Sequence, residues 1–404
     1  MGEATQSIRR DVASTALSII ESFALVDNDT AINDTGDGLP SNTESLALTR
    51  FIVQKVLVPV VVCLGVLGNV LNMVILTRRS MKSSTNCYLT ALAAFDTLYL
   101  VFSLTLSFKH YSTFSRIPSY VYWYPYGRVF TDMSANVSVL LTVTFTVERY
   151  IGVCLPMKGR ILCTVQRAKV IIAVVVAAAI MCTVPELFEM TVVEKTVDNV
   201  SFPVADYTEF SLSYGYKMGY YWFFVTVFTF IPLILLCVFN GILIQSVFNA
   251  VKIRRQMTLT SPSNNAHRSP RYAGEQQKIT KMLITVVLVF LLCQIPGAVL
   301  LLYWSYVDLA AVKLPVKIKN DLKIAGNCTN LLVQINASIN FILYSLISTK
   351  FRRVFCHVVC KTTKAKRVNG MSKNSEYTAV HTAGSVNMQS FKLHHLHYHC
   401  HNGV

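Results

Sequence analysis

The stretch "MSANVSVLLTVTFTVERYIGVCLP", Met133 to Pro156, runs from a long apolar segment into an adjacent acid and base. It carries no formal charge from Met133 to Phe145, and Glu148 and Arg149 follow in the same segment. An apolar run of this kind is typical of a helix in lipid, where charged side chains are costly. The presence of Glu148 and Arg149 at the end of this segment therefore calls for a functional explanation.

The composition of the whole chain is that of a membrane protein. Its 404 residues are 53% hydrophobic and only 14% charged, and the mean hydropathy is +0.46. Soluble domains carry about 25% charged residues. Because backbone groups in lipid must be bonded internally, apolar segments of roughly 20 residues predict helices. We expect an all-α, seven-transmembrane helix bundle with spans near Phe51–Leu76, Tyr88–Phe108, Val129–Ile151, Val170–Met190, Tyr220–Phe248, Lys281–Trp304 and Leu322–Ile347.

Basic residues predict the orientation of the bundle. Lys and Arg gather after the first, third, fifth and seventh spans, whereas the first fifty residues and the segment after the fourth span are acidic or mixed. Cytoplasmic loops carry the positive excess, so the N-terminus is expected outside and the C-terminus in the cytoplasm. Lys313, Lys317 and Lys319, before the seventh span, run against this trend. Basic loops facing anionic lipid account for the net charge of +16, so we expect the lipid bilayer and no nucleic acid as a partner.

Four regions follow from this reading. Residues 1–50 form an extracellular tail, 51–347 the bundle, 348–360 an amphipathic juxtamembrane helix and 361–404 a disordered cytoplasmic tail. Cys328 alone among the cysteines is expected near the outer face, so an extracellular disulfide within the chain is not expected. The modification sites expected are glycosylation at Asn28, Asn33 and Asn199 and palmitoylation at Cys356 and Cys360.

Polar residues inside the spans are few. Asp96 is the only acid in the middle of a span, and uncharged polar residues occur at similar depths in other spans: Asn69, Ser138, Asn336 and Asn340. They predict either one polar cluster around Asp96 or scattered contacts between helices, and spacing alone leaves both open.

An ordered set of motifs narrows the class of protein. Asn69, "LAAFD", "ERYIGVCLP", Pro232, "FLLCQIP" and "NFILY" before "SLISTKFRRVF" follow one another between Phe51 and Cys360. This set resembles the rhodopsin-like (class A) G-protein-coupled receptors. The resemblance implies a multi-pass plasma-membrane receptor, not an enzyme, with an extracellular ligand, a heterotrimeric G protein, and arrestin after phosphorylation of the tail.

The resemblance also assigns roles to particular residues. Glu148 holds Arg149 at rest and releases it to the G protein when the sixth helix moves outward, a switch formed by Glu148, Arg149, Tyr150, Asn340 and Tyr344. The activation hinge is Phe290, Gln294 and Pro296. An allosteric Na⁺, with no other cofactor or metal, is expected at Asp96, Ser138, Asn336 and Asn340.

Departures from the family pattern suggest a subfamily. Phe341 replaces the usual Pro, Gln294 the usual Trp and Asn240 an inward Tyr, and Tyr124 stands near the Cys of the usual disulfide. Together they look most like FMRFamide-type invertebrate neuropeptide receptors and related vertebrate orphan receptors.

The same resemblance bears on the ligand. Amine receptors place an acid at the position of Thr131, and the neighbouring Asp132 is expected to face elsewhere. Peptides of the FMRFamide type end in a basic residue and an amide, and acids at the outer end would attract such a cation. The ligand residues expected are Tyr124, Thr131, Asp132, Glu186, Glu189, Tyr220 and Trp304.

The sequence leaves alternatives of unequal weight. A rhodopsin-like receptor for a small molecule, such as an amine or amino acid, stays open. A channel or transporter with Asp96 as its ion site is a distant alternative, because it would need inverted repeats or more intramembrane charges. An enzyme is not expected, because no intramembrane His or Glu pair, Ser/Lys dyad or His-Glu-x-x-His helix is present.

Overall fold

The computed structural model describes residues 42–115, 117–197, 200–260, 269–309, 312 and 314–358. The chain divides into two compact units, residues 1–353 and residues 354–404. The first unit holds the helix bundle and the polar sites described below. In the second unit only residues 354–358 are described, and they are helical.

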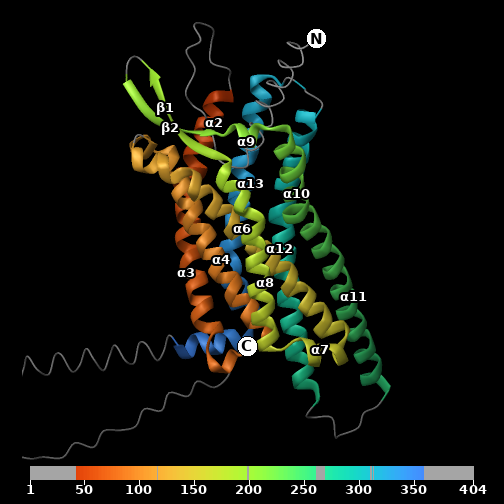
Figure 1. Cartoon of the computed structure of the whole chain (residues 1–404). Coiled ribbons are helices and arrows are strands. Elements are labelled where there is room, and N and C mark those ends of the chain that lie inside the picture. Colours follow the sequence, from red (N-terminus) through yellow and green to blue (C-terminus); the bar gives the residue numbers. More distant parts are fainter. Residues whose placement is uncertain are drawn as a thin grey trace, which may run out of the picture. The chain divides into compact units, whose positions relative to one another are not determined.

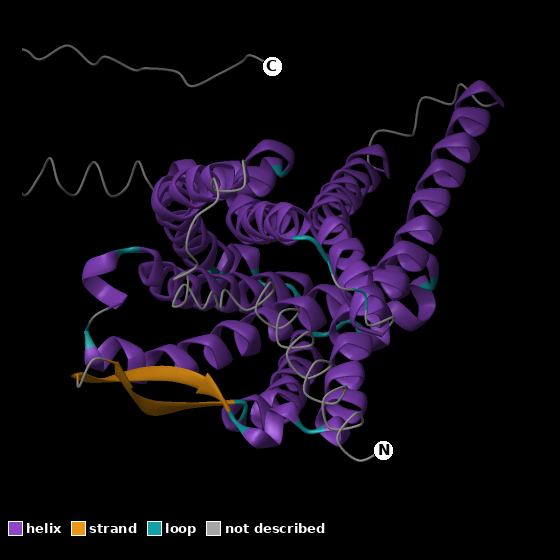
Figure 2. Ribbon diagram, turned by 90° about the horizontal axis from the view of Figure 1, so that it is seen from above, coloured by secondary structure: helices purple, strands orange, loops and turns teal. Residues whose placement is uncertain are grey.

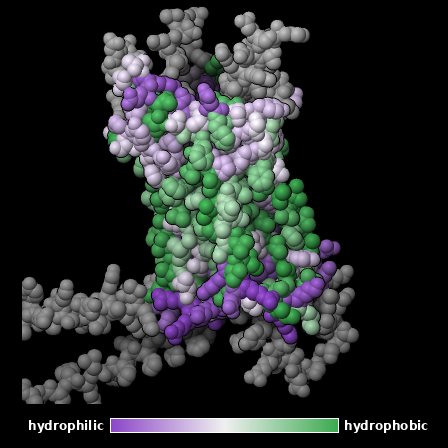
Figure 3. Space-filling view, viewed as in Figure 1, coloured by the Kyte–Doolittle hydropathy of each residue, from purple (hydrophilic) through white to green (hydrophobic). Residues whose placement is uncertain are grey.

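Among the described residues of the first unit, seven helical stretches are long and apolar enough to cross a membrane, which confirms the predicted seven-helix bundle. They run side by side, as two perpendicular views show (Figures 1 and 2). An apolar band crosses the visible face between two more hydrophilic ends (Figure 3). The stretches are Thr43–Leu76, Ser84–His110, Pro118–Cys154, Val165–Phe188, Met218–Ser246, Ile284–Val307 and Val316–Ile347.

Several of these stretches are built from more than one helical segment. The first contains α2 (Asn42–Arg50), η1 (Phe51–Leu57) and α3 (Val58–Leu76), the second α4 (Ser84–Ser107) and η3 (Phe108–His110), the third α6 (Pro118–Cys154), and the fourth α8 (Val165–Thr183) and η4 (Val184–Phe188). The fifth contains η5 (Tyr216–Tyr221), α10 (Trp222–Val225), η6 (Thr226–Phe230) and α11 (Ile231–Thr260). The sixth is α12 (Ser269–Leu309) and the seventh α13 (Val316–Ile347). Short helices lie between or beyond them: η2 (Arg79–Met81), α5 (Ser112–Ser115), α7 (Pro156–Leu162), α9 (Glu209–Leu212) and residues 349–358.

Two helices begin earlier than hydropathy predicts. The first helical stretch starts at Asn42 instead of Phe51, and α6 starts at Pro118 instead of Val129. The first turns of α6 are rich in Tyr and Trp, which lower the hydropathy but pack well. Tyr120, for example, donates a hydrogen bond from its hydroxyl to the Thr105 carbonyl of α4 at 2.9 Å. Contacts with neighbouring elements therefore extend α6 beyond its apolar core.

A β-hairpin follows the fourth stretch, and the sequence analysis did not predict it. Strands β1 (Met190–Val197) and β2 (Val200–Tyr207) pair antiparallel, from Met190 opposite Tyr207 to Val197 opposite Val200. The hairpin lies at one end of the bundle and α7 at the other (Figure 1). We call these ends the hairpin end and the Arg149 end.

Helix α6 occupies the centre of the bundle. It contacts α4, α8, α11 and both strands of the hairpin. One face of α6 therefore passes the interior of the bundle from the hairpin end to the Arg149 end, and its polar side chains define the sites described next.

Candidate functional site

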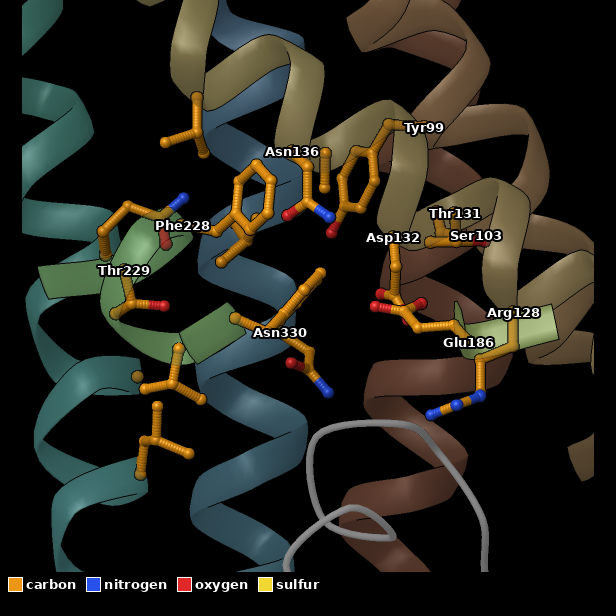
Figure 4. A pocket seen from close by; sticks show the side chains of 18 of the residues that line it. Tyr99, Ser103, Arg128, Thr131, Asp132, Asn136, Glu186, Phe228, Thr229 and Asn330 are labelled. Atoms are coloured by element: carbon orange, nitrogen blue, oxygen red, sulfur yellow. The ribbon is translucent and has the colours of Figure 1, made fainter. Parts of the chain in front are cut away.

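A cavity of about 270 Å³ opens inside the bundle towards the hairpin end. Side chains from α4, α6, η4, the fifth helical stretch, α12 and α13 line it. Its polar side chains converge from several helices, and aromatic side chains from the fifth stretch cover another part of its wall (Figure 4). Concave sites with an apolar wall and a few convergent polar groups are typical of ligand pockets.

Four ionisable side chains gather at one side of this cavity. Arg128 and Asp132 are four residues apart on α6 and therefore share a face of the helix. Glu186 lies in η4 and Glu189 directly before β1. All four line the cavity, and Arg128, Glu186 and Glu189 are only 4%, 5% and 6% exposed. One guanidinium thus stands among three carboxyl groups.

These groups divide into two pairs. The Arg128 guanidinium pairs with the Glu189 carboxylate, which also accepts a hydrogen bond from the Tyr216 hydroxyl at 2.6 Å. The Asp132 and Glu186 carboxyl groups lie within hydrogen-bonding reach of each other. Burial raises the pKa of Tyr216, at the mouth of the bundle, so its hydroxyl stays a donor.

The local chain conformation brings these acids inward. Helix α8 ends at Thr183, whose hydroxyl accepts a hydrogen bond from the Asn136 amide of α6 at 3.2 Å. After the short η4 turn, Thr208 closes the base of the hairpin by donating from its backbone N–H to the Glu189 carbonyl at 2.9 Å. The segment from Glu186 to Glu189 is thereby fixed against α6.

A second polar group lies deeper in the bundle, around Asp96. Its carboxylate accepts hydrogen bonds from the Ser138 hydroxyl at 2.6 Å and the Asn340 amide at 2.8 Å. Asp96 is 3% exposed. Asn69 instead donates to the Ala337 carbonyl at 2.9 Å. No hydrogen bond joins Asn336 to Asp96 in the described part of the chain, so the structure brings together three of the four residues of the expected sodium pocket.

The Glu148–Arg149 pair lies at the Arg149 end. The Arg149 guanidinium donates to Glu148 Oε1 at 2.9 Å, and the Ser84 hydroxyl of α4 donates to the same oxygen at 2.5 Å. The two charged side chains are 8% and 18% exposed, so the pair is largely withdrawn from water. Nearby, burial and the charge of Glu148 raise the pKa of the Cys163 thiol against the lowering effect of Arg149.

Two further expected switch residues, the partly buried Tyr150 and the buried Tyr344, lie beside aromatic rings. The Tyr150 ring lies 5.2 Å from that of Phe239 on α11, and the Tyr344 ring 6.1 Å from that of Phe351. Phe341, in place of the usual Pro, packs at 5.9 Å against the same Phe351 ring.

Comparison with known proteins decides the family. The profile described as "7 transmembrane receptor (rhodopsin family)" matches residues 68–344, more than half of the chain. The chain belongs to this family. It is therefore a multi-pass membrane receptor of the plasma membrane, and the family groups receptors and not enzymes, as the sequence analysis expected.

The individual relatives are receptors that are named after peptides. The receptor is 29% identical to the FMRFamide receptor of Drosophila melanogaster over 326 residues, which cover 77% of this chain and 54% of the fly protein. It is 26% identical to the thyrotropin-releasing hormone receptor of Bos taurus over 372 residues, or 86% of this chain and 89% of the bovine protein. A neuromedin U receptor homolog of Caenorhabditis elegans is 25% identical over 370 residues, with 80% and 86% covered. These relatives confirm the resemblance to neuropeptide receptors.

The structure places most of the expected ligand residues at one site of the receptor. Thr131, Asp132, Glu186, Glu189 and Tyr220 all line the cavity. Asp132 was expected to face elsewhere, and this expectation is wrong, because its side chain lines the cavity and meets Glu186 of η4 there.

Two expected ligand residues are placed outside the cavity lining. Tyr124 packs against Leu106, Met190 and Tyr207 at the base of the hairpin, where the Lys109 ammonium lies 5.6 Å from its ring. Trp304 is 2% exposed in an apolar cluster with Val225, Leu300 and Leu301.

The expected hinge residues of α12 differ in their surroundings. Phe290 is buried against Leu236 and Val287, and Gln294 lines the cavity. Pro296 lies within α12 on an exposed face. Gln294 therefore stands between the cavity and the apolar packing below it.

Sequence reasoning missed Arg128 and Ser84. The third span was expected to begin at Val129, so Arg128 lay one residue outside it. An Arg four residues before an Asp, next to an apolar span, is the signal that would have identified it. Ser84 carries no such signal, because a Ser at the start of a helix is common and its contact with Glu148 joins α4 to α6.

Several expected modification sites lie beyond what is described. Asn28, Asn33, Asn199 and Cys360 are outside the described residues, as is the tail 361–404. Cys356 is exposed on the helix over residues 349–358. The nine described cysteines are free.

Proposed function

We propose that this receptor binds an extracellular peptide with a cationic group and activates heterotrimeric G proteins in response. The observation that carries the proposal is the excess of acid in the cavity, where three carboxyl groups face one guanidinium. A cationic ligand group is the natural complement of this charge. The names of the relatives, receptors for FMRFamide and thyrotropin-releasing hormone among them, support a peptide ligand.

The proposed orientation places the hairpin end outside the cell and the Arg149 end in the cytoplasm. Arg78, Arg79 and Lys82 follow the first helical stretch, and Lys158 and Arg160 follow the third. This excess of basic residues is typical of cytoplasmic loops. A ligand arriving from outside then meets the cavity first, and the G protein meets the face around Arg149.

Activation would couple the two ends by shifting the balance between two conformers. A ligand that binds better when α12 has moved outward favours that conformer by its difference in affinity. The Glu148–Arg149 pair holds the resting conformer, since both side chains are largely buried and separating them exposes each charge. Arg149 would then contact the G protein.

A sodium ion at Asp96 is a further part of the proposal. Asp96, Ser138 and Asn340 supply carboxylate, hydroxyl and amide oxygens, which are hard ligands that fit a small hard cation. No ion pair to Asp96 is present among the described residues. These three side chains would hold the ion, and its charge would favour the ionised form of Asp96.

The ends of the chain would carry regulation. We propose glycans at the three predicted Asn sites, palmitate at Cys356 and Cys360, contact of the basic segments with lipid headgroups, and arrestin binding to the phosphorylated tail. Cys356 is exposed, as a palmitoylation site requires.

The test is calcium release in cells that express the receptor with a promiscuous Gα subunit. Amidated peptides, monoamines and free amino acids are applied separately, and surface expression is measured by antibody labelling. We expect a response to amidated peptides that contain a basic residue, and its loss in Arg149→Ala at unchanged surface expression. A response confined to amines or amino acids would contradict the peptide ligand, and full signalling by Arg149→Ala would contradict the switch.

A further inference from the structure

The carboxyl groups of Asp132 and Glu186 form a close pair inside the cavity. Figure 4 shows them pointing towards one another from α6 and η4, with the Arg128 guanidinium to one side of them. They lie within hydrogen-bonding reach of each other, and Glu186 is only 5% exposed.

Such a contact requires a proton. An ionised carboxylate only accepts hydrogen bonds, so two carboxylates can be joined by one only if one of them is protonated. Glu186 Oε2 receives no hydrogen bond from any described donor. Two neighbouring negative charges in a buried site would also repel each other strongly, and sharing one proton removes that cost.

The surrounding groups offer the pair a single cation, Arg128, whose charge acts on both acids but whose guanidinium is paired with Glu189. On α6, Arg128 is paired with Glu189, which also accepts from Tyr216. Tyr99 of α4 and Tyr220 of η5 face the pair with neutral phenol groups. Helices α12 and α13 contribute uncharged Gln294, Asn330 and Gln334 to the lining. Among the described lining residues, Arg128 is therefore the sole cation, and it already has a partner.

A second side chain in the same cavity also lacks a protein partner. Gln334 of α13 lines the cavity and is 4% exposed, and its Oε1 has no hydrogen-bond partner among the described residues. A buried acceptor without a donor is costly unless something else supplies one. The cavity therefore offers an acidic pair and a separate acceptor, and a ligand that carries several N–H donors satisfies both.

We propose that Asp132 and Glu186 form a proton-for-cation exchange site, which holds one proton when empty and takes the guanidinium or ammonium group of an agonist in its place. This inference rests on the proposed function in that the cation belongs to the agonist. The balance is simple: the cation enters, the shared proton leaves to water, and both carboxylates then face the bound positive charge. Glu186 and Asp132 thereby select cationic over neutral ligands.

The exchange makes ligand affinity depend on pH. Because one proton is released for each cation bound, affinity falls as the pH falls, by up to about tenfold per pH unit in the range where the empty pair holds its proton. A neutral ligand of the same shape shows no such dependence.

The proton is tested first, on purified full-length receptor, by infrared absorption of protonated carboxyl groups. We expect a protonated-carboxyl band that both Glu186→Gln and Asp132→Asn remove. Asp96→Asn, which removes another buried acid of the bundle, and Asp206→Asn, which removes a partly exposed acid of the hairpin, are expected to keep it. A band that survives both Glu186→Gln and Asp132→Asn would overturn the proposal.

The exchange is tested with L-argininamide, a guanidinium compound with an amide, against the neutral L-citrullinamide. Argininamide is expected to diminish the carboxyl band and raise the unfolding temperature of the wild type, and to do neither in Glu186→Gln. Equal effects of the two compounds, or an unchanged band with argininamide, would overturn the proposal. If argininamide removes the carboxyl band of the purified receptor but no peptide causes calcium release in cells, only the proposed function is contradicted. If a peptide causes calcium release but the purified receptor shows no carboxyl band, only the exchange site is contradicted.

Discussion

At the scale of single residues, Arg128 links α6 to the base of the hairpin. Its guanidinium pairs with Glu189 beside β1, in a receptor whose nine described cysteines are free. Tyr124, which stands near the position of the family's usual Cys, packs against Met190 and Tyr207 of the hairpin. The attachment of the hairpin in the described residues is thus an ion pair with apolar packing beside it.

Removing the Arg128 side chain is expected to destabilise the receptor strongly. Arg128→Ala leaves the buried Glu189 carboxylate without its cation, and such a loss costs about 3–5 kcal/mol. The matched control is Lys195→Ala, which breaks the Lys195–Asp206 pair within the hairpin, where the side chains are 50% and 35% exposed. That change is expected to cost about 1 kcal/mol or less. Thermal unfolding of purified receptor checks both, and equal small shifts would show that the buried pair does not hold the hairpin.

The Ser84 hydroxyl donates to the same Glu148 oxygen that accepts from Arg149, and in the proposed switch it helps to hold that pair. Ser84→Ala removes the 2.5 Å hydrogen bond to Glu148 and so weakens its hold on Arg149. Bonds to charged groups contribute about 1.5–3 kcal/mol, and about 1.4 kcal/mol is a factor of ten, so ligand-free signalling is expected to rise by about tenfold. Thr90→Ala is the control, because the Thr90 hydroxyl bonds only to the Asn86 carbonyl of its own helix. Unchanged basal signalling in Ser84→Ala at equal surface expression would contradict this role.

At the scale of elements, hydropathy predicts the seven spans but not the contacts between them. The spans follow from long apolar runs, because any such run in lipid must be helical. The hairpin was not predicted because its strands, Met190–Val197 and Val200–Tyr207, mix polar and apolar residues without a clear pattern. Packing against α4 and α6, which hydropathy does not show, stabilises their pairing. The contact of Asp132 with Glu186 joins α6 to η4, and no spacing within one segment reveals a contact between two.

The packing of α3 against α13 depends on a glycine. A Cβ atom added at Gly68 would lie 2.9 Å from the Phe341 Cβ, whereas one added at Gly241 of α11 would have no neighbour within 4 Å. Gly68→Ala is expected to lower the free energy of unfolding by about 1–3 kcal/mol through overpacking. Gly241→Ala is expected to leave it unchanged or raise it by up to about 1 kcal/mol, because Ala favours the helix. The unfolding temperatures of the Gly68→Ala and Gly241→Ala variants are compared. Equal shifts would mean that the Phe341 side chain moves aside without cost.

At the scale of the whole bundle, one helix carries all three polar sites. Asp132 of the cavity, Ser138 of the Asp96 group and Glu148 of the ion pair follow one another along α6. With a rise of about 1.5 Å per residue, the first two are about 9 Å apart along the axis and the last two about 15 Å. A small movement of α6 or of a helix packed on it therefore reaches the cavity and the Glu148–Arg149 pair together.

This arrangement works as a receptor only if the two ends of the bundle face opposite sides of the membrane, with the hairpin outside. Lys195 of β1 and Met157 of α7 are exposed at opposite ends, with Met157 at 78% and the Lys195 side chain at 50%. In a Cys328→Ser background, which removes an exposed native thiol, Lys195→Cys is expected to react with a membrane-impermeant maleimide in intact cells. Met157→Cys is expected to react only after permeabilisation, because the positive-inside rule places α7 in the cytoplasm. The reverse pattern would contradict the proposed orientation and place the acidic cavity on the side where no extracellular peptide arrives.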